Sequence, residues 1–229
     1  CACLVGSEMC IRDSAYPFVW VVTFLSIFII TSEYIKPLFS NILIKKIACM
    51  FILTYSLFGS SKLFERIQAE LDWGKASTLA LCKSYNETLP TYERLEKMFV
   101  SNPYFLYNYA AVLQEMKQYT ESLEVALKCR QYWADYDLEL IIGENYQQLN
   151  KPELAEKYYN SASMMCPSRF LPLYKLFHLY KTNGEKERSL AMAEAVISKP
   201  MKIKTTTIRM MKREMEREIQ KMNMSIKLE

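Results

Sequence analysis

Residues 103–167 read PYFLYNYAAVLQEMKQYTESLEVALKCRQYWADYDLELIIGENYQQLNKPELAEKYYNSASMMCP, and small residues recur here at a nearly constant interval. Gly143 follows Ala110, and Ala155 and Ser189 follow Ser122, each after one repeat length of about 34 residues. Small side chains at such positions let two helix axes approach closely, which larger side chains prevent. The stretch therefore predicts a helix–turn–helix unit that repeats along the chain.

Three windows align on this interval, and each resembles a tetratricopeptide repeat, a helix–turn–helix unit of about 34 residues. The windows begin at Pro103, Tyr136 and Phe170, their turns are expected at 117–119, 150–152 and 183–185, and Pro167 closes the second. A degenerate window begins near Asp72, with its turn at Asn86. Phe177 breaks the pattern at the small-residue position of the third window, so the packing of that unit is left open. We expect an all-α solenoid, with three repeats in residues 103–203, because each unit covers its neighbour.

The segments on either side of these repeats are also expected to be helical. Residues 61–102 are assigned to a bridging helix and the degenerate repeat. Residues 204–229 are assigned to a capping helix and tail, with threonines placed as an N-cap and apolar residues from Ile208 to Ile219 at 3–4–4 spacing. Glutamates alternate with the basic residues of this last segment, which favours a solvated helix face over a lipid or nucleic-acid site.

Residues 15–60 are predicted to hold two transmembrane helices. Residues 15–32 (AYPFVWVVTFLSIFIITS) carry no charge, and eighteen helical residues span about 27 Å. A signal peptide is the alternative, but no small-x-small cleavage site follows. The second run, 47–61, is shorter, so Lys45 and Lys46 would have to reach the headgroups, and a buried or interfacial helix is the alternative. The Lys45–Lys46 pair slightly favours a cytoplasmic loop and an exported C-terminal domain.

Residues 1–14 (CACLVGSEMCIRDS) resemble a translated sequencing adapter and hold three of the seven cysteines. We expect this stretch to be non-native; a short disordered N-terminus is the alternative. Apart from Met9, the first methionine is Met50, inside an apolar run. We therefore expect the chain to be the C-terminal part of a longer protein.

The whole-chain averages combine these different regions. The 229 residues are 51% apolar and 24% charged, with a net charge of +4, and the five glycines and eight prolines argue against a collagen-like or disordered chain. Residues 60–198 carry 16 basic and 18 acidic residues, whereas residues 199–229 carry 9 and 4. The basic excess therefore belongs to the C-terminal segment rather than to the repeats.

No motif in the sequence predicts catalysis, a cofactor or a metal. We find no Gly-rich phosphate loop, CxxC pair, HExxH or GxSxG, so no catalytic residue or metal ligand is assigned and no cofactor is expected. His178 is the single histidine, on the first helix of the third window, and we favour a structural or surface role for it. Cys82, Cys129 and Cys166 are expected to pack as small apolar residues.

Ligand binding is expected in the concave groove lined by the first helices. The candidates are Tyr107, Asn108, Gln114, Glu144, Tyr174 and His178, a mixture that lacks the Lys/Asn/Arg set for clamping a peptide C-terminal carboxylate. Residues 130–137 (RQYWADYD) add Trp133, Asp135 and Tyr136 between two units. Aromatics flanked by Asp suit sugar recognition, yet a packed corner between repeats explains them equally well.

The features follow one another in a distinctive order: membrane spans, a basic loop, a bridging helix, and then repeats that contain FLYNYAAVL (105–113) and AEKYYNSASMMCPSRFLPLYKLF (155–177). This order resembles the C-terminal end of the Bacteroidetes-type O-antigen ligase/polymerase family. The resemblance covers about residues 15–220. It implies an inner-membrane glycosyltransferase for undecaprenyl-diphosphate-linked glycans in cell-surface polysaccharide or lipopolysaccharide assembly, with periplasmic repeats that bind protein or glycan. The family's catalytic positions lie in an earlier loop that this sequence lacks, so no catalytic residue carries over and enzyme activity is left open. The alternative is a membrane-anchored repeat scaffold that binds protein partners; a nucleic-acid partner is not expected.

Overall fold

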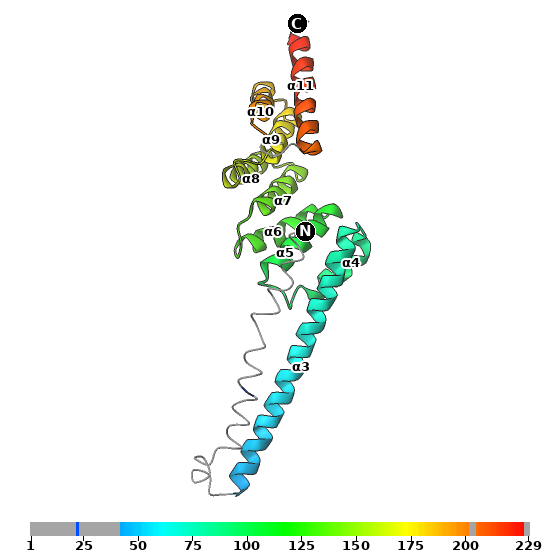
Figure 1. Cartoon of the computed structure of the whole chain (residues 1–229), viewed down its shortest axis with the longest axis vertical. Coiled ribbons are helices and arrows are strands. Elements are labelled where there is room, and N and C mark those ends of the chain that lie inside the picture. Colours follow the sequence, from blue (N-terminus) through cyan, green and yellow to red (C-terminus); the bar gives the residue numbers. More distant parts are fainter. Residues whose placement is uncertain (1–21, 23–41, 202–204, 227–229) are drawn as a thin grey trace. The chain divides into compact units, whose positions relative to one another are not determined.

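A computed structural model describes residue 22 and residues 42–201 and 205–226 of the chain (Figure 1). These residues form helices and turns, with no strand among them. The helices are α3 (Ile42–Leu81), α4 (Tyr85–Leu95), α5 (Pro103–Glu115), α6 (Tyr119–Arg130), α7 (Tyr136–Gln148), α8 (Pro152–Met165), α9 (Leu171–Thr182), α10 (Lys186–Ser198) and α11 (Thr206–Ile226). They belong to two compact units, Cys1–Met98 and Phe99–Glu229. The predicted all-α class is confirmed for the described residues.

In the first unit, α4 packs against the C-terminal part of α3. Tyr92 of α4 and Trp73 of α3 are both buried. The Tyr92 hydroxyl lies 3.2 Å from Ser77 Oγ, and Arg94 Nη2 donates to Asp72 Oδ2 at 2.7 Å. Apolar burial and polar contacts therefore fix α4 to the helix that the sequence predicts as a bridge.

The first part of α3 carries large apolar side chains that the described residues do not cover. Met50, Phe51, Leu57 and Phe58 are each between 63% and 73% exposed. Within the described residues, no helix is both long and apolar enough to cross a membrane. The predicted second span, 47–61, lies within α3 and is not confirmed. The predicted first span and the suspected adapter stretch lie outside the described residues, apart from residue 22.

The same backbone turn ends α3, α5, α7 and α9. The second residue after each helix has a left-handed backbone, with φ of 63° at Lys83, 62° at Lys117, 54° at Asn150 and 79° at Gly184. After α5, for example, Lys117 N donates to Gln114 O and Gln118 N donates to Leu113 O, both at 2.9 Å. The equivalent pair of bonds occurs at the other three turns, which makes all four Schellman motifs.

These turn residues carry the period of the repeat, because each follows the previous one after a tetratricopeptide unit of about 34 residues. The turns predicted at 117–119, 150–152 and 183–185 contain three of them. The turn predicted at Asn86 is wrong, because α3 already ends at Leu81 and Asn86 lies in the first turn of α4. The left-handed residue there is Lys83, and a lysine gives no sequence signal for a conformation that glycine and asparagine favour.

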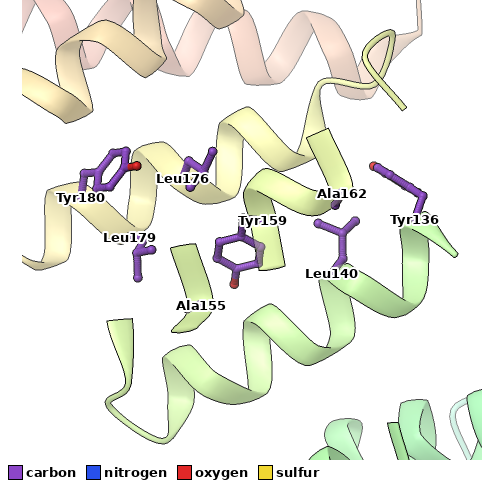
Figure 2. Packing of buried hydrophobic residues seen from close by; sticks show 8 residues of the cluster. All are labelled: Tyr136, Leu140, Ala155, Tyr159, Ala162, Leu176, Leu179 and Tyr180. Carbon is purple, nitrogen blue, oxygen red and sulfur yellow. The ribbon is translucent and has the colours of Figure 1, made fainter. Parts of the chain in front are cut away.

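A glycine allows α7 and α8 to approach closely. A Cβ atom at Gly143 would lie 2.6 Å from Cε1 and 2.7 Å from Cδ1 of Tyr159. Figure 2 shows the Tyr159 ring in the middle of a buried cluster, with Leu140 of α7 on one side and Leu176 and Leu179 of α9 on the other. The expected role of small residues in letting the helices approach is confirmed at this seam.

Phe177 is accommodated in the third unit by an exchange of large and small residues. Phe177 occupies the position that Gly143 has in the preceding unit, and Ala193 occupies the position that Tyr159 has there. Phe177 and Ala193 are both fully buried and belong to one hydrophobic cluster. The ring comes from the first helix in this unit, whereas in the preceding unit Tyr159 of the second helix lies against Gly143 of the first.

Two polar contacts lie within the core of the second unit. Ser122 Oγ donates to Ala110 O at 2.7 Å, and Asn145 Nδ2 donates to Ser122 Oγ at 2.8 Å, which links α5, α6 and α7. The fully buried Glu139 of α7 accepts a hydrogen bond from Arg130 Nε at the end of α6. A buried carboxylate requires such a partner, because its desolvation is costly.

Helix α11 covers the third repeat at the C-terminal end. Met215 is fully buried in the cluster that contains Phe177, and Ile208, Met211 and Ile219 pack against that cluster. Thr205 Oγ1 accepts a hydrogen bond from Ile208 N at 3.3 Å, as expected of an N-cap threonine. The opposite face carries exposed arginines, namely Arg209, Arg213 and Arg217. A polar outer face is what a terminal helix of a solenoid requires.

Candidate functional site

The first helices of the three complete repeats, α5, α7 and α9, present a partly exposed surface that we call the first-helix face. Its members are Tyr104, Tyr107, Asn108, Ala111, Gln114, Glu144, Gln147, Tyr174, Lys175, His178 and Lys181. Helix α5 contacts α7, and Lys175 Nζ of α9 lies 2.9 Å from Glu144 Oε1 of α7. These contacts make the face continuous from α5 to α9.

An aromatic cluster, formed by Tyr104, Tyr107 and Trp133, lies at the α5 end of this face. The Trp133 ring centroid is 5.6 Å from that of Tyr104 and 5.8 Å from that of Tyr107, with the second pair close to edge-on. The turn after α6 positions Trp133, whose backbone N–H donates to Cys129 O at 3.0 Å. Tyr104 is 45% exposed and Trp133 is half-buried, so the cluster presents ring surface to solvent.

Two carboxylates follow Trp133 at the start of α7. Asp135 is the N-cap residue, and its Oδ1 accepts a hydrogen bond from Asp137 N at 2.9 Å. Desolvation and the neighbouring Asp135 charge raise the pKa of Asp137, while Arg169 opposes this shift. Within the described part of the chain neither carboxylate forms an ion pair. Arg169 therefore offsets part of the negative charge at the start of α7.

Tyr136 does not belong to this exposed surface. It is 8% exposed and lies in the core cluster with Leu140. Burial raises the pKa of Tyr136 to about 12, and the Arg169 guanidinium carbon lies 5.8 Å from its ring centroid. For Tyr136 the packed-corner alternative applies, since its ring fills the space between two repeats.

Amide side chains occupy the middle of the first-helix face. Gln147 Oε1 accepts a hydrogen bond from the Tyr159 hydroxyl at 2.8 Å, which ties this amide to the core. Gln114 Nε2 is buried and has no hydrogen-bond partner among the described residues. Asn108 is half-buried nearby on α5. The α5 half of the face thus holds a polar donor that the fold leaves unused.

At the α9 end, the first-helix face is engaged by α11. The Tyr174 hydroxyl donates to Glu214 Oε2 at 2.8 Å, and His178 Nε2 lies 3.4 Å from Glu214 Oε1. Lys181 Nζ pairs with Glu218. The predicted candidates Tyr174 and His178 therefore face a segment of the same chain.

His178 is half-buried and packs against its neighbours on α9. Its ring centroid lies 5.0 Å from that of Phe177. Burial lowers the pKa of His178, Glu214 opposes that shift, and the charges of Lys181 and Lys175 add to it. The environment favours the neutral imidazole, in agreement with a structural role.

The sequence analysis did not predict three residues of this region as candidates: Tyr104, Glu214 and Glu218. Tyr104 stands three positions before Tyr107, on the same helix face, so helical spacing could have identified it. Glu214 and Glu218 are four positions apart on one face of α11 and meet α9. Their spacing was visible, but their partners on α9 are about 40 residues away in sequence.

The described residues contain no group of three His, Cys, Asp or Glu side chains that could hold a metal ion. Cys129 is buried, and its burial raises the pKa of the thiol to about 11. A thiol with such a pKa is a poor nucleophile at neutral pH.

Comparison with solved structures identifies the architecture. The chain is similar to the crystal structure of MamA, with a TM-score of 0.50 and 15% identity over 54% of this chain and 72% of MamA. It is also similar to YrrB, a tetratricopeptide-repeat protein with an unusual peptide-binding site, with a TM-score of 0.52 and 17% identity over 61% of this chain and 73% of YrrB. The chain contains a tetratricopeptide-repeat solenoid.

No family model and no curated protein sequence matches the chain. At 15–17% identity, the likeness to MamA and YrrB shows the fold alone. Helices α5 to α10 form three consecutive helix–turn–helix units.

Proposed function

We propose that this protein is a tetratricopeptide-repeat scaffold that binds a protein partner through the first-helix face. The observation that carries the proposal is the continuous, partly exposed face of α5 and α7. The α9 end already has an internal partner in α11. The peptide-binding site of YrrB, which has a similar fold, adds support.

The chemistry of the face favours an extended, internal segment of the partner. A side-chain amide can donate to and accept from a peptide backbone, so Asn108 and Gln114 suit an extended chain. The lysines on the face are already paired, Lys175 with Glu144 and Lys181 with Glu218. A C-terminal carboxylate would therefore find no unpaired lysine there.

The test begins with a phage-displayed library of short peptides selected on the full-length chain. Selected peptides are labelled with fluorescein, and their dissociation constants are measured by anisotropy. Ala111→Trp fills the face between Tyr107 and Gln114 and should weaken binding at least tenfold. Gln114→Ala, a milder change, should weaken it several-fold. Ala191→Trp, at an exposed position on the second helix α10, is the matched control and should bind as the wild type does.

Circular dichroism spectra must show that all three variants keep their helix content. If no peptide is selected, or if Ala111→Trp and Gln114→Ala bind the selected peptides as tightly as the wild type, the first-helix face is not the binding surface.

We also propose that residues 15–60 anchor this scaffold in the bacterial inner membrane, with the repeats in the periplasm. The exposed apolar side chains of Phe51, Leu57 and Phe58, on more than one side of α3, support burial of this helix in an apolar environment. Retention in the membrane pellet after alkaline carbonate extraction would be expected. An alkaline phosphatase fusion after Glu229 should be active, and an inactive but expressed fusion would refute the periplasmic location. An origin in the O-antigen ligase/polymerase family gains no support from the structural neighbours and rests on the order of sequence features alone.

A further inference from the structure

We propose that α3 of one chain pairs in parallel with α3 of a second copy of this chain. The pairing surface is an apolar line on α3 that we call the α3 stripe, formed by Leu57, Phe64, Ile67 and Leu71. The inference rests on the proposed function in one respect, because the membrane anchor holds every copy in the same orientation. It concerns a surface that is separate from the first-helix face.

The members of the α3 stripe follow the spacing of a two-stranded coiled coil. Leu57, Phe64 and Leu71 are seven residues apart, and Ile67 lies three residues after Phe64. Side chains at this spacing form one line along a helix, which is the pattern through which paired helices interlock. Leu57 is 71% exposed, Phe64 63% and Leu71 51%, and Ile67 is half-buried. The line is therefore apolar and largely open along about 21 Å of helix.

Helix α4 packs on the opposite side of α3. Trp73 is buried on that side, and Ser77 lies 3.2 Å from the Tyr92 hydroxyl of α4. Trp73 is two residues after Leu71, and two residues turn a helix by about 200°. A second helix can therefore lie along the α3 stripe without displacing α4.

Lipid covers only the beginning of the α3 stripe. The predicted second span ends at Ser61, and Leu71 lies ten residues further along the helix, or about 15 Å. The headgroup layer on each side of the hydrocarbon core is only about 5–8 Å thick. The ion pair of Lys62 with Glu65, at 2.8 Å, also lies between the predicted span and Leu71. The outer part of the stripe therefore requires a protein surface to cover it.

The charges of α3 favour an identical partner. In a symmetric parallel pair, each residue of the seam lies opposite its own copy, so a charge in the seam would meet a like charge. The α3 stripe carries no charge. The charged residues of 62–70 lie off this line and pair within the chain, Lys62 with Glu65 and Arg66 with Glu70. A charged partner would find no counter-charge on the stripe, whereas a second copy in the same membrane presents the same uncharged line at the same depth.

The first experiment cross-links the full chain in its membrane, after its seven cysteines are replaced with alanine. Leu71→Cys should form a disulfide between two copies on mild oxidation, because the pair brings the two Cβ atoms of this seam position close together. Glu65→Cys is the matched control, since the Glu65 side chain is 52% exposed but lies off the stripe. Denaturing gels without reductant should show about fivefold more dimer, or a larger excess, for Leu71→Cys than for the control.

The second experiment measures the dissociation constant of the pair by light scattering of the full chain in a mild non-ionic detergent. Leu71→Glu places two carboxylates opposite each other and should raise this constant by about tenfold or more, because like charges in an interface repel. Leu71 is half exposed in the single chain, so the variant should keep its fold, which circular dichroism checks. Leu154→Glu, at an apolar position of α8 that is 39% exposed, is the matched control and should leave the constant unchanged.

A monomer in both experiments, equal cross-linking of Leu71→Cys and Glu65→Cys, or a dissociation constant that Leu71→Glu leaves unchanged would each overturn the α3 pair. A monomer whose Leu71→Cys thiol is also protected from a water-soluble maleimide would show that another segment of this chain covers the stripe instead. Retention of a monomer in the carbonate-washed membrane pellet would show that the anchor holds even so. Weakened peptide binding by Ala111→Trp tests the first-helix face separately, so failure of the pair and failure of the proposed function are distinguishable.

Discussion

Replacing Gly143 with alanine tests the close approach of α7 and α8. The new Cβ would lie 2.6 Å from Cε1, 2.7 Å from Cδ1 and 3.3 Å from Cζ of Tyr159, whereas ordinary contacts begin near 3.4 Å. The ring cannot turn away freely, because it is fully buried and its hydroxyl donates to Gln147 Oε1 at 2.8 Å. The substitution must therefore push the two helices apart or force the ring out of its rotamer.

The size of the effect follows from two opposing contributions. Overpacking a core costs about 1–3 kcal/mol, and two ring atoms below 3 Å place Gly143→Ala in the upper part of that range. Alanine recovers about 1 kcal/mol because of its higher helix propensity. We expect a net loss of about 1–2 kcal/mol in the free energy of unfolding. For a unit of this size that corresponds to a fall in Tm of about 4–8 °C.

The assay is urea unfolding followed by circular dichroism at a helix-sensitive wavelength, with thermal melts alongside. Gly74→Ala is the matched control, because Gly74 is also helical but has nothing within 4 Å of an added Cβ. That change should stabilise its own unit by about 0.5–1 kcal/mol. In a Tyr159→Ala background, Gly143→Ala should become neutral or stabilising. If Gly143→Ala is as stable as the wild type, or if its cost persists without the ring, the close approach is not what requires glycine.

Three further predictions concern the turns, the buried ion pair and the histidine. Both Lys117 and Gly184 have a left-handed backbone, which glycine adopts at least cost. Lys117→Gly should therefore raise the free energy of unfolding by up to about 1 kcal/mol, and Gly184→Ala should lower it by a similar amount. Thermal melts should show Tm shifts of opposite sign for the two variants. Arg130→Met should lower the free energy of unfolding by about 2–3 kcal/mol, because Glu139 would stay buried without its partner. The loss is smaller than for a fully buried pair because Arg130 is partly exposed. Adding Glu139→Leu should recover most of this free energy, as measured by urea titration. Burial lowers the pKa of His178 in the folded state, so its contribution to stability is complete above its unfolded pKa of about 6.5 and is lost as the pH falls. His178→Phe should therefore flatten the plot of unfolding free energy against pH between pH 7 and pH 5. An unchanged slope would contradict this prediction.

Much of the fold could be predicted because its packing rule repeats in sequence. Gly143 and Ala110 recur in phase because helices approach at the same place in each unit, and that place tolerates only limited volume. Phe177 shows where this rule stops, because in its unit the first helix supplies the ring and the small partner, Ala193, comes from the second helix. The turn at Lys83 was missed because its window is degenerate, whereas Lys117, with the same backbone and bonds, lies in a window whose small residues recur in phase.

The candidate site could be predicted only in part, because exposure depends on neighbours that are distant in sequence. Helical spacing brought Tyr107 and Gln114 to the first-helix face, where the structure places them. The same spacing could not show that Glu214 would bond to Tyr174 across about 40 residues of chain. Nor could it show that Tyr136 begins its helix inside the core, since a residue at a helix start has no preceding turn to define its face.

The three repeats also show how units of one fold can differ in their surface contacts. The core restricts volume at the seams, so Ala155 has small counterparts in Ser122 and Ser189, whereas the segments that follow the second helices differ from one another. That segment supplies Arg169 to the ring of Tyr136 and Lys199 to the ring of Phe170, and both rings are thereby covered from within the chain. After α6 it supplies Trp133, which adds aromatic surface instead of charge. The segments that follow the second helices thus differ in what they contact within the chain, while each unit keeps its helix–turn–helix form.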